Sequence, residues 1–166
     1  MSPAETQLDV LAVFSHPDDA ELSVAGTLLK LKKLGYRTGV CDMTHGEMGT
    51  RGTPEIRAKE ALEAARVMKL DVRVNLEQPD GHVWPTEVAR TALVRVLRTH
   101  RPKVLITTHE DDPHPDHANT SIIVRQGARL ASMGSPKRSS SMAILCGMRA
   151  ARLLIRPPVN PTFTSG

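Results

Sequence analysis

The sequence predicts an α/β protein built on a doubly wound, mainly parallel β-sheet with the strand order 3-2-1-4. Short apolar runs alternate four times with longer segments of helical periodicity, a pattern typical of parallel strands joined by helices. The first and last of these runs are followed by loops rich in histidine and aspartate. A doubly wound sheet reverses direction beside its first strand, which makes the first and fourth strands neighbours.

The first strand, helix and second strand follow one another directly. Residues 8–14 are a short apolar run that ends at a proline motif, which indicates a buried strand. Leucine and alanine then recur at helical spacing over 20–34, and Gly35 is a natural C-terminal stop. Residues 37–43 again have the composition of a strand. The three glycines of 45–53 predict a loop after it.

The second helix and third strand come next. Thr53 offers an N-cap and Pro54 a first-turn proline, so a helix is expected over 54–69. Residues 72–76 are expected to form the third strand. The stretch PDG at 79–81 predicts a turn.

The last helix–strand–helix unit has a long polar loop. Apolar residues recur at helical spacing over 88–97, ahead of Pro102. Residues 103–108 are expected to be the fourth strand. The polar segment 109–117 predicts a loop, and a helix is expected from 118 to 131.

The charge distribution divides the chain in two. Residues 1–120 hold 15 lysines and arginines against 18 acidic residues, whereas 121–166 hold 7 basic residues and no acid. The basic pI therefore argues poorly for a nucleic-acid partner of the main domain. We expect one domain over 1–131 and an atypical basic, Ser/Pro-rich, poorly ordered tail over 132–166, in which 142–155 forms a short helix.

Composition excludes several classes of protein. No run approaches the roughly 18 apolar residues of a membrane span, and the N-terminus lacks a signal-peptide pattern. Cys41 and Cys146 are isolated, which predicts neither a disulfide framework nor a zinc ribbon. We therefore expect a cytoplasmic protein with no membrane partner.

A histidine and two carboxylates stand where the first strand gives way to the helix, in the stretch FSHPDDAEL. One interpretation is that Asp18 or Asp19 caps the helix and Glu21 completes a capping box. The other is that these acids and His16 hold a metal ion and a catalytic base. A carboxylate has enough lone pairs to serve both purposes.

A second polar cluster follows the fourth strand. The stretch HEDDPHPDH packs three histidines and four acidic residues into nine positions. A solvated acidic loop is the plain alternative, but such a loop has no need of three histidines. If the first and fourth strands are neighbours, both clusters lie at the carboxyl edge where doubly wound folds bind ligands. Together they predict a metal site.

The donor types indicate the metal and the chemistry. Imidazole with carboxylate oxygen suits zinc, iron or manganese. A catalytic zinc ion takes three protein ligands, for which we expect His16, Asp19 and His117. Asp18 is then placed to take a proton from the attacking water. His114 would stabilise the oxyanion or protonate the leaving amine.

Four stretches carry a family resemblance. SHPDDAEL, THGEMGTRGTPEIR, NLEQPDG and HEDDPHPDHANTS together resemble the LmbE/PIG-L family of zinc-dependent N-deacetylases, closest to its bacterial branch of bacillithiol-pathway deacetylases. The resemblance covers about residues 8–131. It implies a Rossmann-like fold that removes acetyl from an N-acetylamino sugar, such as an N-acetylglucosamine conjugate, with Zn²⁺ or another divalent ion such as Fe²⁺.

The resemblance also implies roles for single residues. It gives the metal ligands and the general base already named, and makes His114 the histidine that assists the tetrahedral intermediate. It further implies that Asp116 orients this histidine and that Arg57 contacts the substrate. Without the resemblance, Arg57 would be read as a solvated helix residue.

Smaller candidates lie in the other loops. His45 and Glu47 either rim a pocket or lie on a plain surface loop. Asp80 is typical of a turn, although its loop also follows a strand at the same sheet edge. His109, Asp111 and Asp112 either support the site or are solvated.

The resemblance stops after about residue 131, where family members continue with further strands and helices. We therefore expect a truncated or frame-shifted chain that lacks the C-terminal part of the fold and leaves its fourth strand with an open edge. Two alternatives follow: a metal-binding but inactive homologue or sugar-binding module, and a metal-dependent phosphoesterase with two ions. The expected partner is a small N-acetyl sugar, and assembly into a homo-oligomer stays open.

Overall fold

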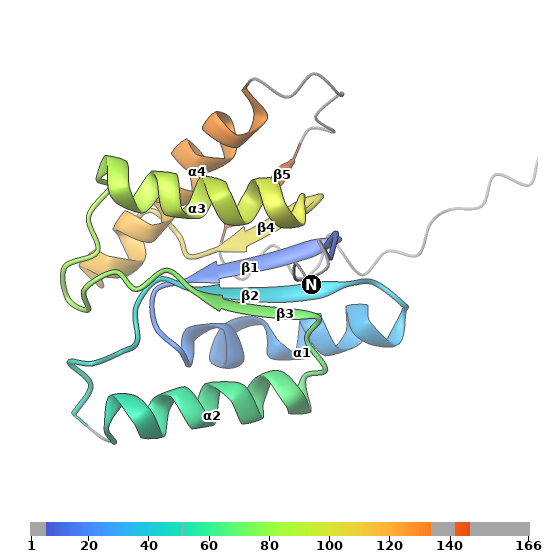
Figure 1. The fold of residues 1–166 in the computed structure, drawn as a ribbon, viewed down its shortest axis with the longest axis horizontal. Helices are drawn as coiled ribbons and strands as arrows, with labels where there is room; N and C mark the ends of the chain where they lie inside the picture. Colours follow the sequence, from blue (N-terminus) through green and yellow to red (C-terminus); the bar gives the residue numbers. More distant parts are fainter. Residues whose placement is uncertain (1–5, 51, 134–141, 147–166) are drawn as a thin grey trace, which may run out of the picture.

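The computed structural model describes residues 6–50, 52–133 and 142–146 (Figure 1). Strands and helices alternate along the described chain. In order they are β1 (Val10–Phe14), α1 (Asp19–Lys33), β2 (Thr38–Asp42), α2 (Pro54–Val67), β3 (Val72–Asn75), α3 (Glu87–His100), β4 (Val104–Thr107), α4 (Pro115–Ser132) and β5 (Ala143–Cys146). No helix of these described segments is long and apolar enough to cross a membrane.

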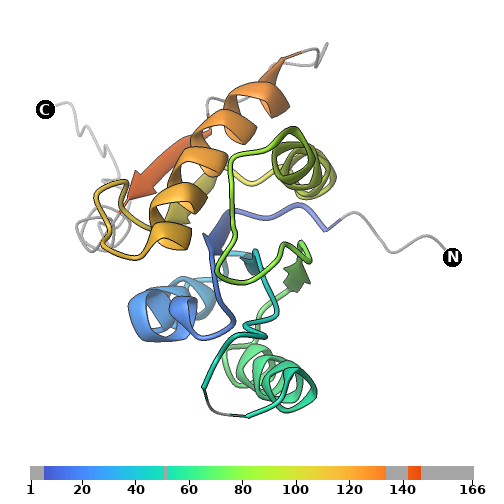
Figure 2. The same ribbon diagram turned by 90° about the vertical axis from the view of Figure 1, so that its left-hand side faces the viewer.

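The five strands form one parallel sheet in the order β3-β2-β1-β4-β5. This confirms the predicted order 3-2-1-4 and places β1 beside β4, with Val13 opposite Thr107. Helices α1 and α2 cover one face of the sheet and α3 and α4 cover the other, as Figures 1 and 2 show. The polar loops that follow the strands therefore gather at one edge of the sheet, which faces the viewer in Figure 2.

The central strands β1 and β2 lie in the interior of the described sheet. Every residue of β1 and β2 is buried, as expected for strands that are covered on both faces. Alternate residues of β1 pack into two separate apolar clusters: Leu11 contributes to the cluster under α3 and α4, and Ala12 to the cluster under α1. The two clusters hold β1 firmly, and with it the loop that follows.

Helix α2 is packed quite differently. None of its residues is buried, although its N-terminus is well formed: Thr53 accepts a hydrogen bond from the Ile56 N–H and Pro54 occupies the first turn. Because α2 makes so little apolar contact, its position against the sheet depends more on polar interactions.

The N-terminus of α1 shows whether Asp18 or Asp19 caps this helix. Asp18 occupies the N-cap position of α1, but its side chain accepts no capping hydrogen bond. Asp19 is the first helical residue, and its Oδ2 accepts from the backbone N–H of His16 at 2.9 Å. Helix α4 begins at Pro115, three residues earlier than expected, so that the second histidine cluster lies partly inside its first turn.

The expected helix over 142–155 is wrong where the structure describes it. Residues 143–146 form β5, which pairs in parallel with β4. The expected open edge at β4 is therefore wrong as well, because β5 occupies it. This strand belongs to the main sheet rather than to a separate tail. The remaining expectations for the tail concern 134–141 and 147–166, which lie outside the described residues.

Candidate metal and catalytic site

Three side chains from two distant segments converge at the carboxyl edge of the sheet. His16 follows β1, Asp19 opens α1, and His117 lies in the first turn of α4. Asp19 Oδ2 lies 3.3 Å from His16 Nδ1 and 3.1 Å from His117 Nε2. The two ring nitrogens are 3.3 Å apart. The structure thus brings together the three residues that the sequence predicts as metal ligands.

The spacing of these donor atoms fits a small tetrahedral cation. Ligands about 2.0–2.1 Å from a tetrahedral zinc ion stand about 3.3 Å from one another. The three observed separations span 3.1–3.3 Å. Two imidazoles and one carboxylate are also a donor set that catalytic zinc uses. These side chains could therefore hold Zn²⁺ or Fe²⁺ and leave a coordination position open.

Both imidazoles are held from behind by carboxylates. His117 Nδ1 lies 3.2 Å from Asp112 Oδ1. His16 Nε2 lies 3.1 Å from Asp80 Oδ1 and 3.4 Å from Asp116 Oδ2. A carboxylate on the far nitrogen fixes the ring orientation of a metal-binding histidine and makes it more basic. The sequence presents Asp80 as a turn residue whose loop also follows a strand at this edge, and the structure places it behind His16.

The shifted pKa values of the three expected ligands favour positively charged histidines beside an ionised aspartate. Burial opposes a positive charge on His16, but the neighbouring carboxylates, Asp19 foremost, raise its pKa to about 9. A hydrogen bond with Asp19 likewise raises the pKa of His117. Burial opposes the negative charge of Asp19, yet hydrogen bonds from both histidines hold its pKa far below its usual value. A divalent cation would replace the protons on His16 Nδ1 and His117 Nε2. It would be bound by the same Asp19 carboxylate that these protons face.

The expected base lies on an adjoining pocket wall. Asp18 and Arg57 line a pocket of about 340 Å³ between α1 and α2. Arg57 Nη2 lies 3.5 Å from Asp18 Oδ2, and only 18% of the arginine side chain is exposed. The arginine is therefore placed beside the expected base rather than in solvent. The pocket is also lined by Pro17, Glu21, Gly52, Glu60 and Ala64.

The glycine-rich loop after β2 makes room for Arg57. A Cβ atom on Gly46 would lie 2.7 Å from Arg57 Nε, and one on Gly49 would overlap Nη1. The loop is tied to the next one by two reciprocal hydrogen bonds, in which Met48 N–H donates to Asp80 and the Asp80 N–H donates to Glu47. Glu47 therefore supports the loop arrangement rather than lying free on the surface.

His114 stands over the two ligand rings. It stacks on His117 with 4.6 Å between ring centroids and meets His16 edge-on at 5.0 Å. Its Nδ1 accepts a hydrogen bond from the Asp116 N–H, so the neutral ring carries its proton on Nε2. A donor beside the expected metal position is what assistance at an oxyanion or leaving amine requires.

Asp116 is the most buried carboxylate of the site, with 1% of its surface exposed. Its two oxygens accept hydrogen bonds from the N–H groups of Gly81 and Val83. The carboxylate therefore ties α4 to the loop after β3 and faces His16. Its contact with His114 passes through the backbone N–H, so the orienting role of its side chain stays a prediction.

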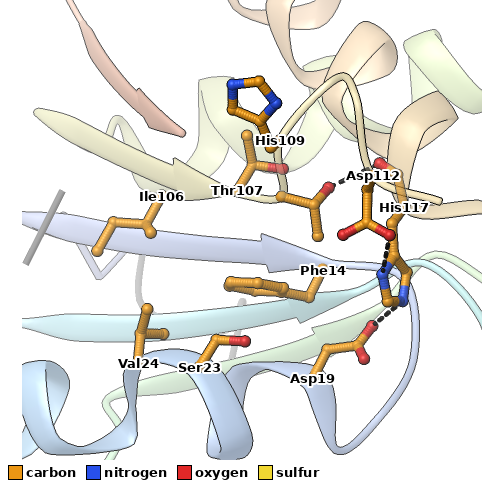
Figure 3. A pocket seen from close by; sticks show the side chains of 10 residues that line it. Phe14, Asp19, Ser23, Val24, Ile106, Thr107, His109, Asp112 and His117 are labelled. Atoms are coloured by element: carbon orange, nitrogen blue, oxygen red, sulfur yellow. Dashed lines mark hydrogen bonds and ion pairs between the residues drawn. The ribbon is translucent and has the colours of Figure 1, made fainter. Parts of the chain in front are cut away.

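A second, more apolar pocket adjoins the ligands on the other side of α1. It has a volume of about 230 Å³, and Figure 3 shows Asp19, Asp112 and His117 at one end with Phe14, Val24 and Ile106 farther along the sheet. The apolar pocket thus includes two of the expected ligands, Asp19 and His117, whereas the polar pocket is lined by Asp18, the neighbour of Asp19 in the chain.

The chain resembles known proteins in sequence and in fold. A family model described as PIG-L, GlcNAc-PI de-N-acetylase, matches residues 11–128. Mycothiol S-conjugate amidase from Streptomyces coelicolor is 31% identical over 144 residues, which cover 69% of this chain and 49% of that protein. The chain therefore spans about half the length of this curated relative.

Two solved structures resemble the fold closely. The conserved protein TT1542 from Thermus thermophilus matches with a TM-score of 0.79 and 41% identity, over 85% of this chain and 66% of that one. N,N'-diacetylchitobiose deacetylase from Pyrococcus horikoshii matches with a TM-score of 0.70 and 27% identity, over 80% of this chain and 52% of that one. Because the family model spans most of the chain and includes both histidine–aspartate segments, this protein belongs to the PIG-L family.

Proposed function

We propose that this protein is a zinc-dependent hydrolase that removes the acetyl group from an N-acetylamino sugar, with an N-acetylglucosamine conjugate as the substrate class. The observation that carries the proposal is the donor triangle of His16, Asp19 and His117, with Asp18 on the wall of an adjoining polar pocket. Family membership supports the reaction class, since the family description and two of the similar proteins name de-N-acetylation or amide hydrolysis.

The residues divide the work as follows. A zinc ion in the triangle would act as a Lewis acid and make water acidic enough to attack at neutral pH. Asp18 takes the proton of the attacking water and passes it toward the departing nitrogen. Arg57 lies beside Asp18 and, in the same pocket, offers donors to sugar hydroxyls. His114 donates from Nε2 to the oxygen that gains charge or to the leaving amine.

The polar pocket suits a sugar better than the apolar one. Its lining combines Asp18, Glu21 and Glu60 with the guanidinium of Arg57, which gives acceptors and donors for hydroxyl groups. The amide group of the substrate would then lie between this pocket and the donor triangle.

The test is acetate release from N-acetylglucosamine, N,N'-diacetylchitobiose and N-acetylglucosamine conjugates. We expect turnover that a chelator abolishes and added Zn²⁺ or Fe²⁺ restores, with one ion bound per chain. Release of acetate that survives complete metal removal would refute the proposed mechanism. A ratio near two ions per chain with phosphate-ester hydrolysis would favour the phosphoesterase alternative instead.

Asp18→Asn separates the base from the metal site. We expect the variant to bind one zinc ion but to lose turnover by about 10²- to 10⁴-fold, the usual contribution of a positioned base. The matched control is Asp111→Asn in the loop after β4, where 86% of the side chain is exposed. Normal turnover by Asp18→Asn would remove Asp18 from the mechanism. Metal binding without turnover in the unaltered protein would favour the binding-only alternative.

A further inference from the structure

Arg73 sits beneath the polar pocket, on a strand that the sequence presents as ordinary. It is the second residue of β3, and only 7% of its side chain is exposed. A buried guanidinium is costly unless its hydrogen bonds are satisfied. The contacts of Arg73 show why the protein keeps it there.

All five N–H groups of this guanidinium have an acceptor. The Nε and one Nη2 proton go to the two carboxylate oxygens of Asp42, at 2.8 and 3.1 Å. Nη1 donates to Glu21 and, at 3.0 Å, to the carbonyl oxygen of Ala61. Nη2 also donates at 3.0 Å to the carbonyl oxygen of Pro17. Five is the full donor capacity of an arginine side chain.

These acceptors belong to the two walls of the pocket. Pro17 lies between His16 and Asp18, and Glu21 lies on the same wall in the first turn of α1. Ala61 lies on α2, one turn after Arg57, which forms the opposite wall. Asp42, at the end of β2, anchors the guanidinium to the buried sheet. One side chain therefore joins the turn that carries the base to the helix that carries Arg57.

The weak packing of α2 makes this connection important. None of the residues of α2 is buried, so apolar contact alone does little to fix its distance from α1. In the turn that carries Asp18, the carbonyl oxygen of Pro17 accepts a hydrogen bond from Arg73, directly beside the expected base. We infer that Arg73 is a positioning residue that sets the spacing between Asp18 and Arg57 by clamping the two walls of the substrate pocket to β2.

This inference rests on the proposed function, because it concerns the same pocket. It requires the planar fork of arginine, since a lysine ammonium has only three donors and no fixed geometry. A purely structural role would predict a loss of stability with normal kinetics once the buried charge is balanced. A positioning role predicts altered kinetics in a protein that is still fully folded.

The decisive variant is Arg73→Met combined with Asp42→Asn. It removes the Arg73–Asp42 ion pair as a unit and leaves the carboxylate of Glu21, whose side chain is 22% exposed, to be solvated at the pocket, so the fold is expected to survive. With Asp42→Asn alone as the reference, we expect kcat/KM for acetate release to fall about 10- to 100-fold, the usual cost of losing a supporting contact. Both a lower kcat and a higher KM are expected, while zinc content stays at one ion per chain. Kinetics equal to those of the reference would overturn the inference.

Two further variants sharpen the test. Arg73→Lys keeps the charge and is expected to recover only part of the lost kcat/KM; full recovery would show that charge alone suffices and would overturn the clamp. Arg66→Met removes another guanidinium, carried by α2 and 76% exposed, and is the control that should leave kinetics unchanged.

Amide hydrogen exchange keeps the inference separate from the proposed function. If the unaltered protein hydrolyses no N-acetyl sugar, the proposed function fails, but the clamp is still measurable. We expect the double variant to show faster exchange over α2 (Pro54–Val67) than the Asp42→Asn reference, with β1 unchanged. Equal exchange in the two proteins would overturn the clamp independently of any substrate.

Discussion

His16 uses both ring nitrogens, one toward the donor triangle and one toward carboxylates behind it. Nδ1 faces Asp19 and His117, whereas Nε2 faces Asp80 and Asp116. A ring held from both sides has little rotational freedom, so its donor atom is preorganised for a cation. His117 is held in the same way by Asp112. At the scale of single residues, the site depends as much on these carboxylates as on the donors themselves.

Asp112→Ala tests the supporting carboxylate of His117. The change removes the acceptor at Nδ1 and leaves all three donors in place, so zinc affinity should fall about 10- to 100-fold without loss of the fold. Competition with a fluorescent chelator measures the affinity. Asp111→Ala, one position earlier, is the matched control and should bind zinc normally. An unchanged affinity in Asp112→Ala would show that Asp112 does not support the site.

Asp42 gives the protein a distinct dependence of stability on pH. Burial raises its pKa to about 6, against the opposing effect of Arg73. The native state therefore keeps a proton that the unfolded chain releases near pH 4, so this residue stabilises the fold below pH 4 and loses its contribution as the pH rises through 6. In urea unfolding, the stability of the natural protein relative to Asp42→Asn should fall by about 1–3 kcal/mol between pH 4 and 7. A constant difference over that range would contradict the raised pKa.

At the scale of elements, the loop after β2 is shaped around the guanidinium of Arg57. A methyl group on Gly49 would overlap Arg57 Nη1 and come within 3.1 Å of the Gly46 carbonyl oxygen. The arginine is thereby confined to the side of the pocket where Asp18 lies.

Gly49→Ala should displace Arg57 and leave the metal donors untouched. We expect KM for the N-acetyl sugar to rise about tenfold or more, with zinc content unchanged, because one charge-assisted contact to substrate is lost. Steady-state kinetics of acetate release measure the effect. Gly26→Ala in α1 is the control: its Cβ meets nothing within 4 Å, and it should leave KM unchanged while stabilising the helix by up to about 1 kcal/mol. A normal KM in Gly49→Ala would show that Arg57 does not need its present place.

The elements also show where sequence reasoning succeeds and where it stops. The positions of His16, Asp19 and His117 follow from strand order, because parallel strands end at the same edge and β1 is beside β4. The clamp of Arg73 does not follow, since its acceptors include backbone carbonyls in the turn before α1 and on α2 that no pattern identifies. Strand β5 was also unpredictable, because four apolar residues without a turn signal fit a helix or a strand equally well.

At the scale of the whole molecule, β5 completes the described sheet and covers the edge of β4. Ile144 packs against the larger apolar cluster, whereas its neighbour Ala143 is exposed. Replacing each of these two residues by aspartate therefore tests the buried and the exposed face of β5 separately.

Ile144→Asp should destabilise the fold by about 2–4 kcal/mol, because it places an unpaired carboxylate against apolar side chains. Ala143→Asp adds the same charge on the same strand but on the exposed face, and should cost less than about 1 kcal/mol. Chemical denaturation of both variants measures the difference. Equal losses would show that β5 contributes little to the sheet.

The separation of the donors along the chain links metal capture to the order of folding. His16 and His117 are 101 positions apart, and they meet only after β4 has docked beside β1. Such a contact of high sequence separation forms late, once the central strands have paired. A metal ion that bridges the two segments would therefore bind only to chains in which β1 and β4 have already paired. Once bound, it would slow the unfolding of these chains.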